Sequence, residues 1–123
     1  MTNGQKAELL INQYGFDFST ISKAEIIDLL EAEISKQKSG PDHGSSEYIR
    51  LLCGYLYCLG DPSDVPLIEK AKYTITMDIG SMIDREWIDS LNNGGVEDAY
   101  VRSRQDIIDG FISYYKEFEA DDV

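Results

Sequence analysis

Histidine, cysteine and tryptophan are scarce in this sequence, which has one histidine, two cysteines and one tryptophan in 123 residues. The histidine, His43, lies in the loop-like segment GPDHG, and no CxxC or HxxxH pattern accompanies it. A zinc site is therefore not expected. Cys53 and Cys58 are five positions apart, which points them to different sides of a helix. We expect two buried, reduced thiols and no disulfide.

Long hydrophobic runs are also missing. No segment approaches the roughly 20 consecutive apolar residues that a membrane-spanning helix needs. The N-terminal segment, MTNGQKAELLINQYG, has neither the continuous apolar core nor the small-residue cleavage site of a signal peptide. These absences predict a soluble, cytoplasmic protein that does not insert into membranes.

Motifs that carry catalysis are absent, because the sequence has no P-loop, no GxSxG and no GxGxxG. Four carboxylates do lie close together in the sequence, on Asp78, Asp84, Glu86 and Asp89. Paired carboxylates can serve acid–base catalysis or bind metal ions. Asp84 and Glu86, however, diverge because they are two positions apart on a predicted helix, and no ExxH pair of the di-iron type is present. We expect no enzymatic activity, no cofactor and no metal.

Basic residues are few compared with acidic ones. The chain has 11 basic and 23 acidic residues, a net charge of −12 and an isoelectric point near 4.3. The imbalance is uneven, since residues 61–123 hold 15 acidic and 6 basic residues, a net charge of −9. Such a field opposes binding to nucleic acid or to an anionic membrane, both of which need clustered lysine and arginine. It favours either solubility alone or a basic partner, and the composition leaves both open.

What the sequence does contain is helical patterning, most clearly in SEYIRLLCGYLYCLG at about residues 46–60. On a helix this segment is apolar on nearly every side, and only Arg50, Gly54 and Tyr57 are left to face water. A helix that is hydrophobic almost all round is a buried one, so other helices must cover it. The segment therefore predicts an all-α fold around a buried central helix.

The remaining patterns fit one compact helical domain over residues 1–123, with five or six helices and a frayed acidic tail at 120–123. Phe16 and Phe18 are predicted to pin a connector to the core before a second helix that starts at the capping box Ser22–Glu25. Residues 38–45 form a glycine- and proline-containing loop. Residues 73–80 are an extended connector or a continued helix. A helix follows from Ser81, and the last helix runs from about 96–99 to 119.

The segment 59–72 resembles sequences of known helical families. The run LGDPSDVPLIEKAK, residues 59–72, resembles the turn and second helix of a HEAT-type repeat, which implies HEAT-like helix pairs. The matching positions are Leu59, Gly60, Asp61, Asp64, Val65, Leu67 and Ile68. Together with DIGSMID at 78–84, the block is also similar to small helical proteins encoded beside bacterial polymorphic toxins and taken to be immunity proteins.

Two functional interpretations follow. In the first, the chain is an acidic immunity protein that neutralises a cognate basic bacterial toxin, with a nuclease as the expected activity, by direct binding. In the second, it is a helical adaptor or self-associating scaffold without a toxin partner. If the acidity serves binding, the predicted contact residues lie in the last two helices, with Trp87 as the aromatic anchor provided that the core does not consume its ring. They are Asp84, Trp87, Asp89, Asp98, Asp106 and Asp109.

Overall fold

The structure is a computed structural model that describes residues 2–39 and 47–118, and every regular element in these ranges is helical. Its α-helices are α1 (Asn3–Tyr14), α2 (Lys23–Ser39), α3 (Glu47–Leu59), α4 (Val65–Tyr73), α5 (Met77–Met82), α6 (Arg85–Asn92) and α7 (Arg104–Lys116). Two short 3₁₀ helices, η1 (Phe18–Thr20) and η2 (Pro62–Asp64), precede α2 and α4. The predicted all-α class is confirmed, with seven α-helices in the described ranges instead of five or six.

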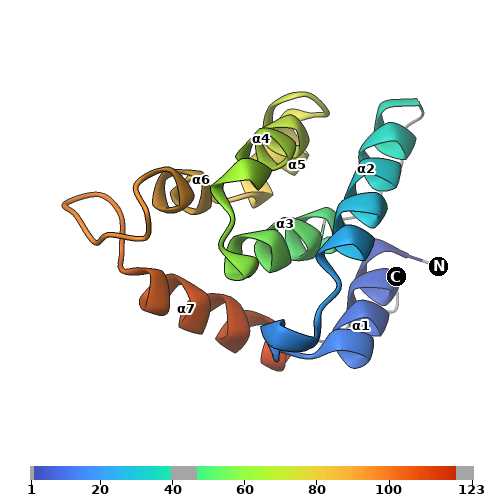
Figure 1. Cartoon of the computed structure of the whole chain (residues 1–123). Helices are drawn as coiled ribbons and strands as arrows, with labels where there is room; N and C mark the ends of the chain where they lie inside the picture. Colours follow the sequence, from blue (N-terminus) through green and yellow to red (C-terminus); the bar gives the residue numbers. More distant parts are fainter. Residues whose placement is uncertain (1, 40–46, 119–123) are drawn as a thin grey trace.

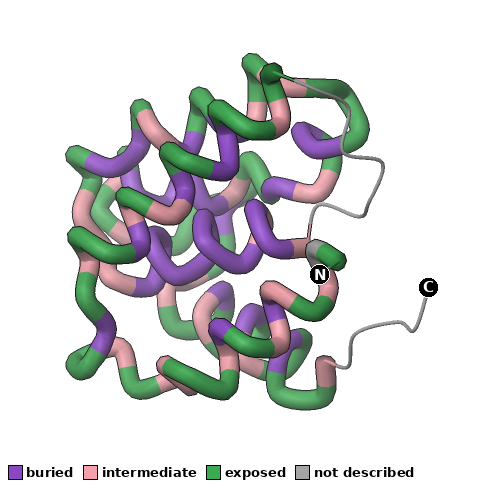
Figure 2. The backbone as a smooth tube through the Cα atoms, turned by 90° about the vertical axis from the view of Figure 1, so that its right-hand side faces the viewer, coloured by how far each residue is buried: buried purple, intermediate pink, exposed green. Residues whose placement is uncertain are grey.

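The central helix of the fold is α3, as the sequence predicts. Helices α1 and α2 pack on one side of it, and α4, α5 and α6 pack on another, while α7 runs below (Figure 1). Every residue from Leu51 to Cys58 is buried, and so are Tyr48 and Ile49. In Figure 2 the tube through the middle of the molecule is accordingly coloured almost entirely as buried. Burial of so many apolar side chains makes α3 the main source of hydrophobic stabilisation.

The predicted water-facing strip on α3 is wrong, because α6 and α7 cover it. Tyr57 has 0% of its surface exposed and exchanges a hydrogen bond of 2.8 Å with Ser90 of α6. Gly54 lies under the ring of Phe111 from α7, so close that a Cβ there would be 2.1 Å from Cε2 of the ring. The absence of a side chain at Gly54 is therefore what lets α7 approach α3.

An aromatic cluster joins the connectors to this core. The Phe111 ring lies 5.9 Å from Tyr55, 6.0 Å from Trp87 and 6.4 Å from Phe16, all near edge-to-face geometry. Phe18 in turn lies 6.2 Å from Tyr55. Such ring pairs stabilise beyond their buried area. The prediction that Phe16 and Phe18 pin the first connector to the core is confirmed.

The turn between α3 and α4 has the local features that the sequence predicts. Gly60 adopts a positive φ of 81°, which ends α3 at little cost. The Asp61 side chain accepts the N–H of Ser63 at 2.9 Å, so that it caps η2, and Pro62 follows at the first position. Lys23 of α2 pairs with Asp61 at 2.6 Å and with Asp64 at 3.0 Å, which ties the turn to the other half of the molecule. HEAT-like pairing of the helices stays a prediction.

The second half of the chain departs from the predicted boundaries. Residues 73–80 are helical for the most part, because Thr76 accepts the N–H of Ile79 at 3.2 Å and starts α5 there. The predicted helix from Ser81 is instead interrupted at Ile83 and Asp84, after which α6 begins. The predicted last helix is also wrong at its start, since α7 begins at Arg104 and residues 93–103 form a loop. Of the predicted loop at 38–45, residues 38 and 39 end α2; the rest of it and the tail at 120–123 lie outside the described ranges.

Candidate functional site

The five predicted aspartates lie along α6, the loop 93–103 and α7. Asp84 precedes α6, Asp89 is on it, Asp98 is in the loop, and Asp106 and Asp109 are on α7. All are exposed except Asp89, which is half-buried. The carboxylates of Glu86, Asp84 and Asp106 together raise the pKa of Arg102, with the hydrogen bond from Arg102 to Glu86 as the largest cause. Asp84 and Asp106 therefore share one neighbourhood around Arg102, although they come from different elements.

The aspartates make only weak ion pairs within the protein. Asp84 lies 3.8 Å from Arg50, and Asp89 lies 3.7 Å from Arg85 one helical turn away. Asp109 accepts a hydrogen bond of 2.8 Å from the Gln105 amide. The Arg85–Asp89 pair is exposed, and pairs of this kind contribute little, about 0–1 kcal/mol each. Asp89 and Asp109 thus remain available to an external cation, whereas Asp84 is shared with the largely buried Arg50.

Asp98 has a different role, because it shapes the loop 93–103. Its Oδ1 accepts the N–H groups of Tyr100 at 2.8 Å and Val101 at 2.9 Å, and its own N–H donates to the Val101 carbonyl at 2.9 Å. At the start of the loop, the Asn93 side-chain oxygen likewise accepts the N–H groups of Gly95 at 3.0 Å and Val96 at 3.1 Å. The side chain predicted to contact a partner is therefore partly occupied in fixing the backbone.

Two basic side chains of this half, Arg102 and Arg104, bond to groups of the protein itself. Arg102 donates to Glu86 through both Nε and Nη2, at distances from 2.7 to 3.2 Å, and its backbone N–H adds a bond of 2.8 Å to the same carboxylate. Arg104 donates to the carbonyls of Tyr57 at 3.1 Å and Cys58 at 2.6 Å. Arg104 is therefore drawn toward the end of α3, whereas the Arg102 side chain is 56% exposed and neutralises one carboxylate, that of Glu86.

Arg50 is a third cation that bonds to the protein itself, and its site also holds Trp87. The Arg50 guanidinium lies 5.1 Å from the Trp87 ring centre, 4.6 Å from that of Tyr114 and 5.4 Å from that of Tyr115, in cation–π range. Trp87 is only 2% exposed and stacks on Tyr57. The prediction of Trp87 as a surface anchor is therefore wrong, because α6 must bury its apolar face and Trp87 is the largest member of that face.

Two tyrosines of α7 complete the Arg50 site. Tyr115 accepts from Arg50 at 2.9 Å and donates to Glu47 at 3.1 Å, and Tyr114 donates to the other oxygen of Glu47 at 2.8 Å. Burial raises the pKa of both hydroxyls, and for Tyr114 the bond to Glu47 raises it further. Both groups therefore stay protonated near neutral pH. The network joins the start of α3 to the end of α7 and is explained by packing alone.

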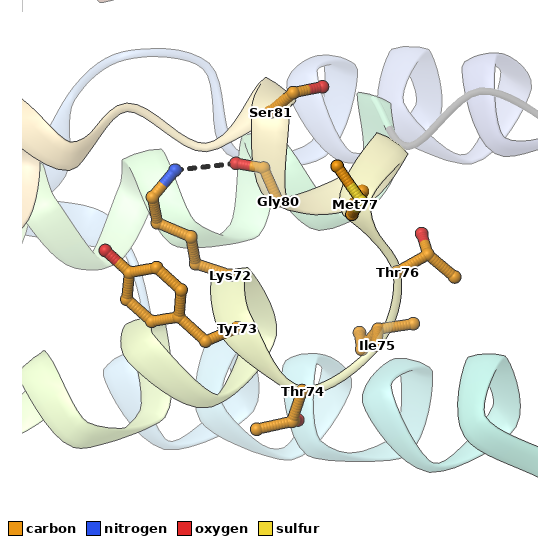
Figure 3. A pocket seen from close by; sticks show the side chains of 8 residues that line it. All are labelled: Lys72, Tyr73, Thr74, Ile75, Thr76, Met77, Gly80 and Ser81. Atoms are coloured by element: carbon orange, nitrogen blue, oxygen red, sulfur yellow. Dashed lines mark hydrogen bonds between the residues drawn. The ribbon is translucent and has the colours of Figure 1, made fainter.

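A shallow pocket of about 520 Å³ lies where α4 meets α5. Figure 3 shows its lining of residues from α4, the turn and α5, with the Lys72 amine directed at the Gly80 carbonyl. Lys72 donates to that carbonyl at 2.6 Å and to the Ile83 carbonyl at 2.5 Å, so its charge caps the end of α5. The lining residues supply hydroxyl and apolar groups but no carboxylate. The carboxylates that the sequence grouped between 78 and 89 are thus not gathered in this pocket.

The remaining chemistry of the described residues is limited. Cys53 and Cys58 are buried and unpaired, and burial raises the pKa of each thiol to about 12. Such thiols carry little thiolate and are poor nucleophiles. No three histidine, cysteine, aspartate or glutamate side chains in the described part of the chain are grouped to hold a metal ion.

Sequence reasoning missed two exposed apolar residues, Val96 and Tyr100, which it assigned to the start of the last helix. Both lie in the loop 93–103 and point outward. The signal that marks the true helix start is Ser103-Arg104-Gln105-Asp106, a capping pattern in which Ser103 accepts the N–H of Asp106 at 3.2 Å. The same pattern would have placed Tyr100 outside the helix.

Comparison of the chain with protein-family models, with curated proteins and with solved structures gives no match. In the ranges 2–39 and 47–118, each helix is too short or too polar to cross a membrane.

Proposed function

We propose that this chain is an acidic protein-binding module, and specifically an immunity protein that neutralises a basic bacterial toxin by direct binding. The observation that carries the proposal is the orientation of charge on α6, the loop 93–103 and α7. Arg50, Arg102 and Arg104 bond to groups of the protein itself, whereas Asp84, Asp106 and Asp109 are exposed. This arrangement supports attraction of a partner rich in lysine and arginine.

The proposed mechanism is occlusion. A toxin that acts on nucleic acid needs a basic surface to hold the phosphate backbone. Carboxylates on α6 and α7 would occupy that surface and keep the substrate away. Complementary charge would chiefly raise the association rate, and the contacts made after docking would set the dissociation rate. A nuclease is thus the toxin class that best fits a partner of this charge.

Co-expression with the product of the adjacent reading frame, followed by co-purification, tests the proposal. Surface plasmon resonance with that product should then show an on-rate that falls steeply with added salt. The double variant Asp106→Asn, Asp109→Asn should lower the on-rate roughly threefold to tenfold at low salt, with little change in melting temperature.

The matched control is Asp28→Asn, Glu31→Gln, which removes the same charge from the exposed side of α2. It should change the on-rate much less, because α2 lies across the molecule from α7 (Figure 1). Equal effects of the two double variants would contradict a binding surface on α6 and α7. Absence of any complex, with self-association in its place, would favour the adaptor or scaffold interpretation.

A further inference from the structure

We infer that residues 94–102 form a preformed anchor that inserts Tyr100 and Val96 into an apolar pocket of a basic partner surface. The inference rests on the proposed function and adds to it the contact segment and the chemistry of the partner site. In Figure 1 this segment projects between α6 and α7, away from the other helices.

The N-terminal end of the segment, at Gly95, is held by Arg104. Its guanidinium binds the last carbonyls of α3 and lies 5.2 Å from the Tyr57 ring centre, so it is tied to the core. Gly95, with a φ of 80°, packs against the stem of Arg104, and a Cβ there would lie 3.3 Å from the Arg104 Cβ and Cδ. The backbone of the loop is thus held against a side chain that the core positions.

The C-terminal end of the segment is held by Val101 and Arg102. Val101 is buried against the core, and Arg102 is clamped to Glu86 of α6 by its side chain and its backbone N–H. Between these two ends, the Asn93 side chain accepts the N–H of Val96 and the Asp98 side chain accepts the N–H of Tyr100. A segment that is held at both ends and bonded within loses little conformational entropy when it binds, and preorganisation of this kind raises affinity.

Two large apolar side chains of the segment face solvent. Tyr100 is 93% exposed and Val96 is 63% exposed, among the most exposed of the large hydrophobic residues. The Tyr100 ring contributes no stabilisation to the free protein, because it is turned into solvent. Tyrosine is, however, one of the residues that most often supply the central energy of protein interfaces.

The charges around these side chains specify the rim of the partner pocket. Glu97 and Asp98 lie between Val96 and Tyr100, and Asp106 follows on α7, all three exposed. A pocket that takes the tyrosine ring is therefore bordered by lysine or arginine, because an acidic border would repel the segment and a basic border attracts the exposed carboxylates beside it. The occupant is a protein with an apolar cavity within a basic surface.

The first experiment needs no partner. Backbone ¹⁵N relaxation of the free protein should give order parameters of about 0.8 or more for amides of residues 95–101, similar to those of α7. The variant Glu86→Gln weakens the bonds between Glu86 and Arg102 and should lower these order parameters. Values below about 0.6 in the unmodified protein would overturn a preformed anchor.

The second experiment measures binding to the purified product of the adjacent reading frame. Tyr100→Ala should weaken affinity about 30-fold or more, mainly through faster dissociation. The control is Met77→Ala, which trims an apolar side chain that is 91% exposed on α5, outside the segment; it should change affinity less than about threefold. If the unmodified chain binds but Tyr100→Ala behaves like Met77→Ala, the anchor is wrong and the proposed function stands. If the unmodified chain does not bind, both are wrong.

Discussion

Helix α3 and the loop 93–103 are both held in place by many interactions, but the two regions use them for opposite purposes. In α3 the side chains point into the protein, and hydrophobic burial holds the backbone. In the loop, backbone N–H groups donate to the Asn93 and Asp98 side chains, and Arg102 and Arg104 hold the two ends, while Tyr100 and Val96 point outward. The difference indicates that a segment fixed mainly by polar bonds, with Val101 as its one buried apolar side chain, can leave Tyr100 and Val96 for a partner.

Thiol labelling should show the largest contrast between the two regions. Cys53 and Cys58 are buried in α3 and should react only when the protein opens, at least about a thousand times more slowly than an exposed thiol. A cysteine introduced by Val96→Cys should react at the rate of a small-molecule thiol. Mass spectrometry after timed alkylation measures both rates in one sample. Rapid modification of Cys53 without denaturant would contradict the burial of α3.

Side-chain truncation should separate the regions by stability. Leu52→Ala or Leu56→Ala removes a fully buried side chain from α3 and should lower the free energy of unfolding by about 2–5 kcal/mol through lost burial and the cavity left behind. Val96→Ala removes a mostly exposed side chain and should change it by less than about 0.5 kcal/mol. Urea denaturation followed by circular dichroism gives the comparison. A loss at Val96 as large as that at Leu52 would mean that the loop is packed in the core.

Acid should loosen the loop 93–103 before it unfolds α3. The change in free energy should be smaller than that of the truncations in α3. Hydrogen bonds from Arg102 lower the pKa of Glu86 below the usual value of a glutamate side chain. A lowered carboxylate pKa contributes stability above the unfolded value, and this is lost as the pH falls through the folded value. The protection factor of the Arg102 amide in hydrogen exchange should therefore fall as the pH drops below about 4.5, and Glu86→Gln should remove that dependence. An unchanged pH profile in Glu86→Gln would show that another group controls the loop.

The sequence was sufficient to predict α3 because its apolar residues cover nearly the whole helix, a local property. It could not predict the burial of Gly54, since that depends on Phe111, which is far along the chain. Likewise, Arg50 appears exposed in a helical projection, but its partner Tyr115 is 65 positions away. Contacts of such long range leave no periodic signal in the sequence.

The start of α7 was mispredicted for a local reason. Tyr100 is seven positions before Ile107, so it falls on the apolar stripe of the last helix if that helix is extended backwards. The helix instead begins at Arg104 with Ser103 as its N-cap, and the side chain of Asp98 bends the preceding backbone. Periodicity therefore hid an exposed tyrosine, whereas the acidic character of this half of the chain was plain from composition.

Amide hydrogen exchange of the complex with the adjacent gene product tests the central proposal most directly, because it maps the contact surface without any substitution. We predict that binding slows exchange in residues 94–102 and in the first turns of α6 and α7, and leaves the exposed sides of α1 and α2 unchanged. Protection confined to α1 and α2, with none in residues 94–102, would contradict the assignment of the binding surface.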